Sequence, residues 1–349
     1  MIQLLMAVGI GFAFSALGTR VLIDILTSRK IGQPIRADGP QGHLVKAGTP
    51  TMGGLAIVGG AVIGYVLSDL IAGGVFTRSG LLVMAAICGA GFVGFLDDWI
   101  KVSRERNLGL NARFKTLGLL TVAISFAVAT VNLTNVSTEL SFARPGVFSI
   151  DFGPVGWVVW AVILLYATSN AVNLTDGLDG LAAGAGVFSF TAYAIIGFWI
   201  FRQAADGDSI YAVSHPLDLA VVAVAMVGAC TGFLWFNSAP AEIFMGDTGS
   251  LAIGTGLAAL ALTTNTQLLL LIIGGLYVAE TLSVMMQVGW FKLTKGKRLF
   301  RIAPIHHHFE ISLPETKVII RFWIIAGGLT ALALGLFYAD WARATDLVR

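Results

Sequence analysis

The chain carries little charge for its length. Of its 349 residues, 12% are Asp, Glu, Lys or Arg, whereas 56% are hydrophobic. A soluble domain has about 25% charged residues, so this composition excludes an ordinary water-soluble globular protein. Most of the molecular surface is expected to face lipid.

Other familiar signals are also missing. The two cysteines, Cys88 and Cys230, lie in apolar runs and indicate no disulfide framework. The N-terminus lacks a basic segment and a small-residue cleavage site, so residues 1–25 are interpreted as a retained first span. No GxxxxGK[ST] phosphate loop occurs. A GxGxxG pattern begins at Gly89, but it lies inside an apolar run, where close helix packing explains it better than a dinucleotide site.

Long apolar runs predict an all-α polytopic membrane protein with one transmembrane domain over residues 1–349. A helix needs about 20 apolar residues to cross a bilayer, and the 42 glycines suit close helix packing in lipid. The ten predicted spans are approximately 3–25, 52–72, 80–97, 116–133, 154–170, 183–201, 216–235, 249–264, 267–289 and 319–338.

The basic residues lie mainly in alternate loops. Sixteen of the 22 Lys and Arg residues fall in residues 26–51, 98–115 and 290–321. Because cytoplasmic loops are rich in Lys and Arg, these loops are predicted to be cytoplasmic and both termini to be outside. The outer segment 132–152 favours a short hairpin, and the cytoplasmic loop 290–318 is histidine-rich. Five basic residues belong to the outer face: Arg78, Arg144, Arg202, Arg343 and Arg349.

Two adjacent carboxylates, Asp97 and Asp98, end the third predicted span. On a helix they point about 100° apart, whereas Asp97 and Lys101 share a face as an i,i+4 pair. One interpretation is an ordinary helix end. The other is a carboxylate that binds a cation or accepts a proton from a phosphate.

The fifth predicted span ends in NAVNLTDGLDG from Asn170, where polar residues recur every three positions. On a regular helix these residues spread over half the circumference, so they cannot all face one pocket. Gly177 and Gly180 offer a break that turns the later residues back toward a cytoplasmic cavity. A solvated loop with two turn glycines is the alternative.

Two further segments carry candidate chemistry. Asp247 precedes the eighth predicted span and is interpreted either as a helix N-cap or as a ligand of a hard cation such as Mg²⁺. The internal run from His306 to His308 cannot serve a single role, because consecutive residues point in different directions on a helix. A zinc site is an open alternative, but imidazoles that meet a diphosphate or a nucleobase fit better.

Five sequence blocks, in this order, resemble one family over nearly the whole chain: KAGTPTMGG from Lys46, the Asp97–Asp98 pair, NAVNLTDGLDG from Asn170, FMGDTGS from Phe244 and APIHHHFE from Ala303. The chain resembles the polyprenyl-phosphate N-acetylhexosamine-1-phosphate transferase superfamily. Within it, the closest likeness is to the phospho-N-acetylmuramoyl-pentapeptide transferase family of peptidoglycan synthesis.

The resemblance implies a Mg²⁺-dependent enzyme with ten helices, outer termini and a cytoplasmic cleft in the bacterial inner membrane. Its reaction would convert UDP-MurNAc-pentapeptide and undecaprenyl phosphate into lipid I and UMP. The lipid bilayer is a further partner, a homodimer is compatible with the family, and no nucleic acid is implied.

The resemblance also implies residue roles. Asp247 resembles the Mg²⁺ ligand, and Asp97, with Asp98 beside it, resembles the acid that deprotonates the lipid phosphate. Further catalytic residues implied by the resemblance are Lys101, Asn173 and Asp176. The expected substrate-binding residues are Lys46, Thr51, Lys115, Asn170, Gly177, Leu178, Asp179, Asn237, Phe244, His306, His307 and His308.

Two other functions compete with this one. A sibling transferase that uses UDP-GlcNAc would share the acid blocks, but the APIHHHFE block favours the muramoyl-pentapeptide branch. A secondary transporter would place its polar groups near the bilayer centre, whereas here they lie at the predicted cytoplasmic ends.

Overall fold

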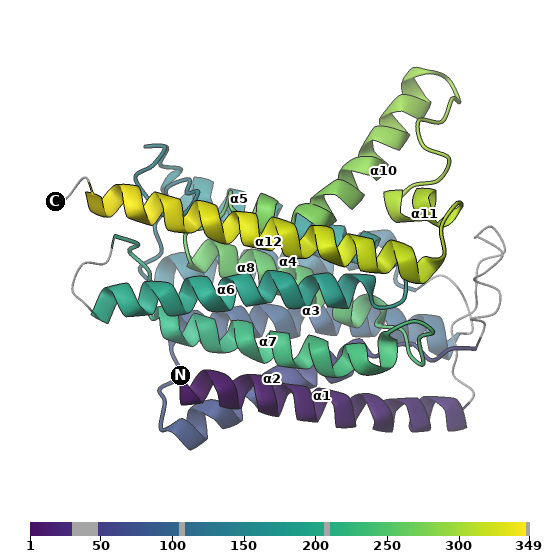
Figure 1. The fold of residues 1–349 in the computed structure, drawn as a ribbon, viewed down its shortest axis with the longest axis horizontal. Coiled ribbons are helices and arrows are strands. Elements are labelled where there is room, and N and C mark those ends of the chain that lie inside the picture. The colour runs from purple at the N-terminus through teal and green to yellow at the C-terminus, as the bar shows by residue number, and fades with distance from the viewer. Residues whose placement is uncertain (30–47, 105–108, 206–209, 347–349) are drawn as a thin grey trace.

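The computed structural model describes residues 1–29, 48–104, 109–205 and 210–346. Lys46 lies outside these ranges. Within them the chain is helical (Figure 1). Its helices are α1 (Ile2–Ser28), α2 (Gly54–Ala72), α3 (Arg78–Ser103), α4 (Ala112–Leu133), α5 (Gly153–Thr175), α6 (Leu181–Ala205), α7 (Pro216–Asn237), α8 (Gly246–Thr263), α9 (Leu270–Ile273), α10 (Gly275–Leu293), α11 (Ile305–Glu310) and α12 (Glu315–Asp346).

Among the described residues, eight helices are long and apolar enough to cross a membrane, namely α1 to α7 and α12. The prediction of a polytopic all-α protein is therefore confirmed. Two more helices, α8 and α10, occupy the eighth and ninth predicted spans with 18 and 19 residues, but they are less apolar. The start of α1 and the end of α12 lie at the same end of the bundle (Figure 1).

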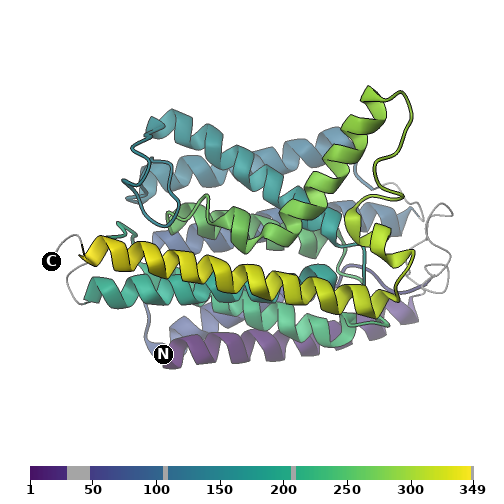
Figure 2. The ribbon, with the colours of Figure 1, turned by 45° about the horizontal axis from the view of Figure 1, so that its top comes forward.

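The ninth predicted span, 267–289, is interrupted. It forms the short helix α9 and then α10, which begins at the second of two consecutive glycines, Gly274 and Gly275. Glycine lowers the cost of leaving a regular helix. Beyond the break, α10 leaves the bundle at an angle to the other helices (Figures 1 and 2). The chain then returns, so that α11 lies against the first half of α10, at Glu280. The histidine-rich loop predicted at 290–318 thus contains a helix of its own.

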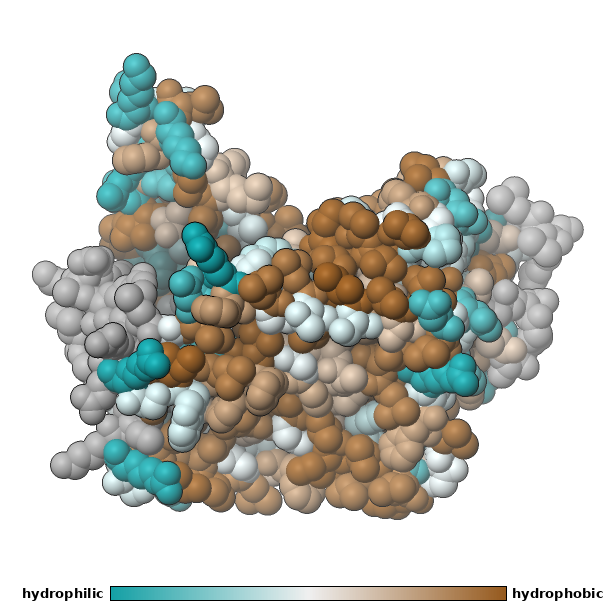
Figure 3. Space-filling view, turned by 180° about the vertical axis from the view of Figure 1, so that it is seen from behind, coloured by the Kyte–Doolittle hydropathy of each residue, from teal (hydrophilic) through white to brown (hydrophobic). Residues whose placement is uncertain are grey.

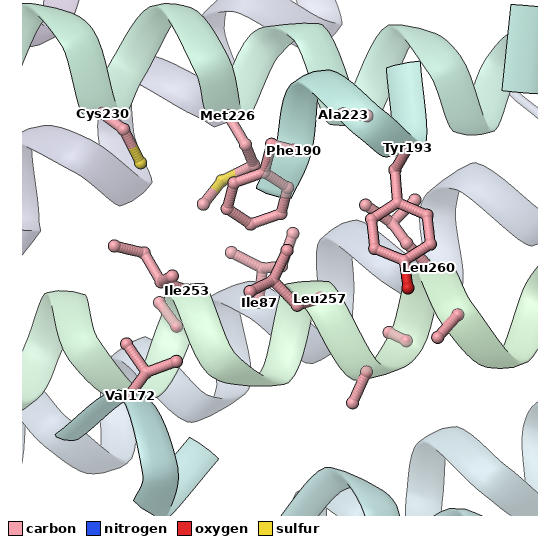
Figure 4. Close-up of a cluster of buried hydrophobic side chains, with 14 of the residues drawn as sticks. Ile87, Val172, Phe190, Tyr193, Ala223, Met226, Cys230, Ile253, Leu257 and Leu260 are labelled. Carbon is pink, nitrogen blue, oxygen red and sulfur yellow. The ribbon is translucent and has the colours of Figure 1, made fainter. Parts of the chain in front are cut away.

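The helix α8 lies at the centre of the bundle. It packs against α3 and α5, while α1 and α6 flank α7. Every residue from Thr248 to Thr263 is buried, and Ile253, Leu257 and Leu260 meet side chains of the surrounding helices (Figure 4). Other helices enclose α8 over this length. Its small residues allow their close approach, and its Leu and Ile side chains fill the space between them.

The molecular surface has the banding of a membrane protein. Hydrophobic side chains cover its middle, and hydrophilic ones gather toward both ends and on the tip of α10 (Figure 3). The segment that favoured a hairpin contains an antiparallel bridge between Glu139 and Asp151. Cys88 and Cys230 are both free thiols.

Candidate functional site

Two of the sequence blocks that are far apart in the chain are joined by backbone hydrogen bonds. The amide of Phe244 donates to the carbonyl of Pro50 (2.8 Å), and the amide of Gly53 donates to the carbonyl of Phe244 (2.9 Å). The amide of Gly54 donates to the carbonyl of Met245 (2.8 Å). Thr51 is buried within this pairing. The KAGTPTMGG block therefore supports the segment that starts α8.

Close approach of α3 to α8 depends on a glycine. A Cβ atom at Gly94 would lie 2.3 Å from the carbonyl oxygen of Asp247, well inside contact distance. The GxGxxG pattern of α3 is thus a packing feature, as predicted, and its last glycine lets the backbone of α8 reach the end of α3.

Gly94→Ala is expected to destabilise the protein by about 1–3 kcal/mol, the usual cost of overpacking a rigid core. It should also displace the start of α8. The denaturation midpoint of the purified protein measures the loss. Gly59→Ala is the matched control, because a Cβ there meets no atom within 4 Å. An unchanged midpoint for Gly94→Ala would contradict this account of the packing.

Asp98 supplies the cap that α8 lacks. No side chain of its own segment caps the N-terminus of α8. Instead, the carboxylate of Asp98 accepts hydrogen bonds from the amides of Asp247 (3.1 Å) and Thr248 (2.9 Å) and from the hydroxyl of Thr248 (2.7 Å). The interpretation of Asp247 as an N-cap is wrong, because α8 begins at Gly246 and Asp247 lies in its first turn.

The carboxylate of Asp247 is held by three side chains from three helices. Its Oδ2 accepts hydrogen bonds from Nζ of Lys101 (3.0 Å) and of Lys115 (2.6 Å). Its Oδ1 accepts one from Nδ2 of Asn173 (2.7 Å), whose amide also reaches the hydroxyl of Ser250 (2.9 Å). The structure thus brings four predicted site residues into direct contact.

Asp97 completes this cluster. Its Oδ2 lies 2.5 Å from Nζ of Lys101, which confirms the predicted i,i+4 contact, and its Oδ1 accepts the amide of Leu110 (2.8 Å). Ligand oxygens of Asp97, Asp98 and Asp247 all lie within 4.8 Å of one another. Carboxylate oxygens at this spacing suit a hard divalent cation.

The turn after α5 faces the same cluster. The helix ends at Thr175, and Asp176 begins the turn that leads to α6. Loss of water, followed by the neighbouring carboxylates of Asp247, Asp98 and Asp179, raises the pKa of Asp176 to about 8 against the opposing charge of Lys101. The cluster therefore has an excess of negative charge that a cation would compensate.

A second group of predicted residues lies beside this turn. Asp179 is buried and accepts the amide of Ala241 (3.0 Å), while its own amide donates to Glu315 (3.0 Å). The side-chain Nδ2 of Asn237 donates to the backbone carbonyl of Ile243 (2.8 Å), just before the half-buried Phe244. Leu178 is buried in the same turn. These contacts link the turn to the segment that precedes α8.

The three histidines differ in environment, as their consecutive positions predicted. His306 is fully buried, with Nδ1 3.0 Å from Oε2 of Glu280. Nδ1 of His307 lies 2.9 Å from Glu310, and Nδ1 of His308 accepts the amide of Arg301 (3.3 Å). The first two lie against the backbone at Gly177.

Not every predicted residue reaches the cluster. The side-chain Nδ2 of Asn170 donates instead to the backbone carbonyl of Tyr166 in its own helix (2.7 Å). Sequence reasoning also missed Ser250 and Glu280. Glu280 carried a usable signal, since a lone carboxylate in an apolar run is costly and often functional. Ser250 carried none, because serine is common in such segments.

Fold and site together define a polytopic membrane transferase. Residues 80–265 match the family model "Glycosyl transferase family 4", and residues 46–58 match "Phospho-N-acetylmuramoyl-pentapeptide-transferase signature 1". The first match includes the Asp97–Asp98 pair, the turn after α5 and the start of α8, whereas the second includes the segment that pairs with Phe244.

Curated relatives are similar over almost the full length. A protein of Frankia alni is 51% identical over 97% of each chain. One from Streptomyces griseus is 51% identical over 97% of this chain and 99% of its own, and one from Thermobifida fusca is 52% identical over 98% and 99%. Each is named phospho-N-acetylmuramoyl-pentapeptide-transferase. The chain belongs to the phospho-N-acetylmuramoyl-pentapeptide-transferase family.

Proposed function

We propose that this protein transfers phospho-MurNAc-pentapeptide from UDP-MurNAc-pentapeptide to undecaprenyl phosphate, giving lipid I and UMP. The supporting observation is the cluster of Asp97, Asp98 and Asp247 with two lysines at the ends of membrane-length helices. Such a site serves a water-soluble donor and a lipid-borne acceptor at once. The names of the relatives support the same donor.

The net reaction exchanges one P–O bond for another. An oxygen of undecaprenyl phosphate becomes bonded to the sugar-linked phosphorus of the donor, and the bond from that phosphorus to UMP breaks. Asp97 takes the proton of the lipid phosphate, and Lys101 and Lys115 offset the negative charge that collects on the phosphates. Phosphoryl transfer depends mostly on such positioning and charge neutralisation.

Mg²⁺ is the proposed cofactor, held by Asp247 together with phosphate oxygens of the donor. When bound, it would neutralise charge on the diphosphate and stabilise the departing UMP. The carboxylate of Asp98 accepts hydrogen bonds at the N-terminus of α8, so its role is to hold Asp247 in position. Asn173 orients the same carboxylate from the other side.

We further propose ten membrane crossings, with α8 and α10 added to the eight apolar helices, in the bacterial cytoplasmic membrane. Both termini would be outside and the acid cluster at the cytoplasmic border. Exposed apolar side chains on α10, including Leu282, Met285 and Met286, offer a surface for the polyprenyl chain of the acceptor. The turn from Gly177 to Asp179, with Asn237 and Phe244, would bind the uridine.

Cysteine labelling tests this orientation. In a background with Cys88→Ala and Cys230→Ala, Lys297→Cys is expected to react with a membrane-impermeant maleimide only from the cytoplasmic side. Val147→Cys, in the loop between α4 and α5, should react only from outside. Both side chains are exposed. The reverse pattern would invert the topology and remove the site from its cytoplasmic nucleotide.

Donor choice tests the proposed function itself. With undecaprenyl phosphate and Mg²⁺, the purified protein should release nucleotide from UDP-MurNAc-pentapeptide and leave UDP-GlcNAc essentially untouched. Release should stop when the lipid is omitted or Mg²⁺ is chelated. Equal use of both donors would move the assignment to the sibling UDP-GlcNAc branch, and transport of either donor without release would identify a transporter.

A further inference from the structure

The helix α10 carries a carboxylate that water does not reach. Glu280 and His306 are both fully buried. Oε2 of Glu280 lies 3.0 Å from Nδ1 of His306 and also accepts the backbone amide of that residue (3.4 Å). Oε1 has no hydrogen-bond partner among the described residues. Removing a carboxylate from water is costly. The contacts of Oε2 with the ring and the backbone amide of His306 offset part of that cost.

The other edge of the imidazole meets the turn after α5. A Cβ at Gly177 would lie 2.4 Å from Nε2 of His306 and 3.3 Å from Nε2 of His307. The ring of His306 can therefore come this close only because position 177 has no side chain. Within the described part of the chain, Nε2 of His306 has no hydrogen-bond partner.

The turn is held from two sides. On one side the ring of His306 lies against Gly177, whose amide donates to the carbonyl of Thr175 (2.8 Å). On the other side Glu315 accepts the amide of Asp179 (3.0 Å). The first contact connects α10 and α11 to the turn, and the second connects α12 to it.

We infer that Glu280 is a positioning residue: by fixing the ring of His306 against Gly177, it holds the Asp176–Gly177 turn in the form that binds the nucleotide donor. A carboxylate on Nδ1 sets both the tautomer and the orientation of an imidazole. As far as the donor is concerned, this inference rests on the proposed function. Glu280 acts through His306, because its carboxylate is fully buried and contacts that residue.

Hydrogen exchange tests the positioning without any assay of activity. In the full-length protein in nanodiscs, Glu280→Gln is expected to speed amide hydrogen exchange in the segment 176–180 at least about tenfold. This corresponds to a decrease of about 1.4 kcal/mol in the free energy of local opening. Ser283→Ala is the matched control. It removes another buried polar group of α10, whose hydroxyl bonds only within its own helix, and it should leave exchange unchanged.

Kinetics test the route through His306. Glu280→Gln should raise KM for UDP-MurNAc-pentapeptide about 10- to 100-fold, as when carboxylates that orient ligating histidines are lost. KM for undecaprenyl phosphate should stay as in the unmodified protein, since a loosened turn affects only the nucleotide. Glu280→Gln combined with His306→Asn should be no worse than His306→Asn alone.

The outcomes separate the two claims. Unchanged exchange at 176–180 in a folded Glu280→Gln protein would overturn the inference, as would additive losses in the double variant or an equal rise of both KM values. Should Glu280→Gln fail to fold, Gly177→Ala breaks the same contact from the turn side and must show the same exchange. Faster exchange in a protein that never releases nucleotide would support the positioning and refute the proposed function.

Discussion

Asp247→Asn is expected to lower the rate of UMP release at least about a hundredfold, the usual effect of removing one group that stabilises charge in a transition state. The amide keeps the size of the side chain and one oxygen acceptor, but it loses the charge that holds Lys101, Lys115 and a Mg²⁺ ion. The fold should persist in this variant, because Asp98 still accepts the hydrogen bonds from the backbone amides at the start of α8.

The measurement is UMP release at limiting Mg²⁺, together with the denaturation midpoint. Asp24→Asn is the matched control, because it makes the same change in an exposed carboxylate whose ion pair with Arg20 is long (3.5 Å). A surface pair of this kind contributes little to stability. Activity of Asp247→Asn within tenfold of the unmodified protein would exclude Asp247 as an essential ligand.

Asp98→Asn should damage both stability and turnover. Its carboxylate accepts three hydrogen bonds at the start of α8, and an amide turns one acceptor into a donor that faces N–H groups. Leaving buried donors unsatisfied costs about 1–3 kcal/mol each. Because these amides fix Asp247, we expect UMP release to fall about a hundredfold as well.

Thr77→Ala separates loss of stability from loss of chemistry. Thr77 caps α3 at the end opposite Asp98, and its hydroxyl and amide contact Asp218. This variant should also lower the denaturation midpoint, yet UMP release measured below that midpoint should stay close to normal. If Asp98→Asn proved as active as Thr77→Ala, the carboxylate would serve the fold alone.

Periodicity and composition predicted the helices well because lipid imposes a simple rule. A span must be apolar over about 20 residues and must satisfy its own backbone. The rule fails where a helix is shielded from lipid. The buried α8 contains small and polar residues and is less apolar than the eight candidate spans. The glycine pair Gly274–Gly275 breaks the ninth predicted span without altering its hydropathy.

The sequence predicted which residues belong to the candidate site, but not which structural role each of them has. Local reasoning offered Asp247 as the cap of α8, because a cap is normally found beside its helix. The actual cap is Asp98, which lies 149 positions before Asp247 in the sequence. Likewise, the histidine block was visible, but the partner that buries His306 lies 26 residues earlier in an apolar helix. Such pairs depend on tertiary packing.

The identity of the released nucleotide tests the central claim most directly. Purified protein in nanodiscs would be incubated with UDP-MurNAc-pentapeptide, undecaprenyl phosphate and Mg²⁺, and both nucleotide and lipid would be analysed by mass spectrometry. We predict one UMP for each lipid that gains a phospho-MurNAc-pentapeptide group. Release of UDP, with the sugar transferred without its phosphate, would contradict the phosphoryl transfer assigned to Asp97, Asp98 and Asp247.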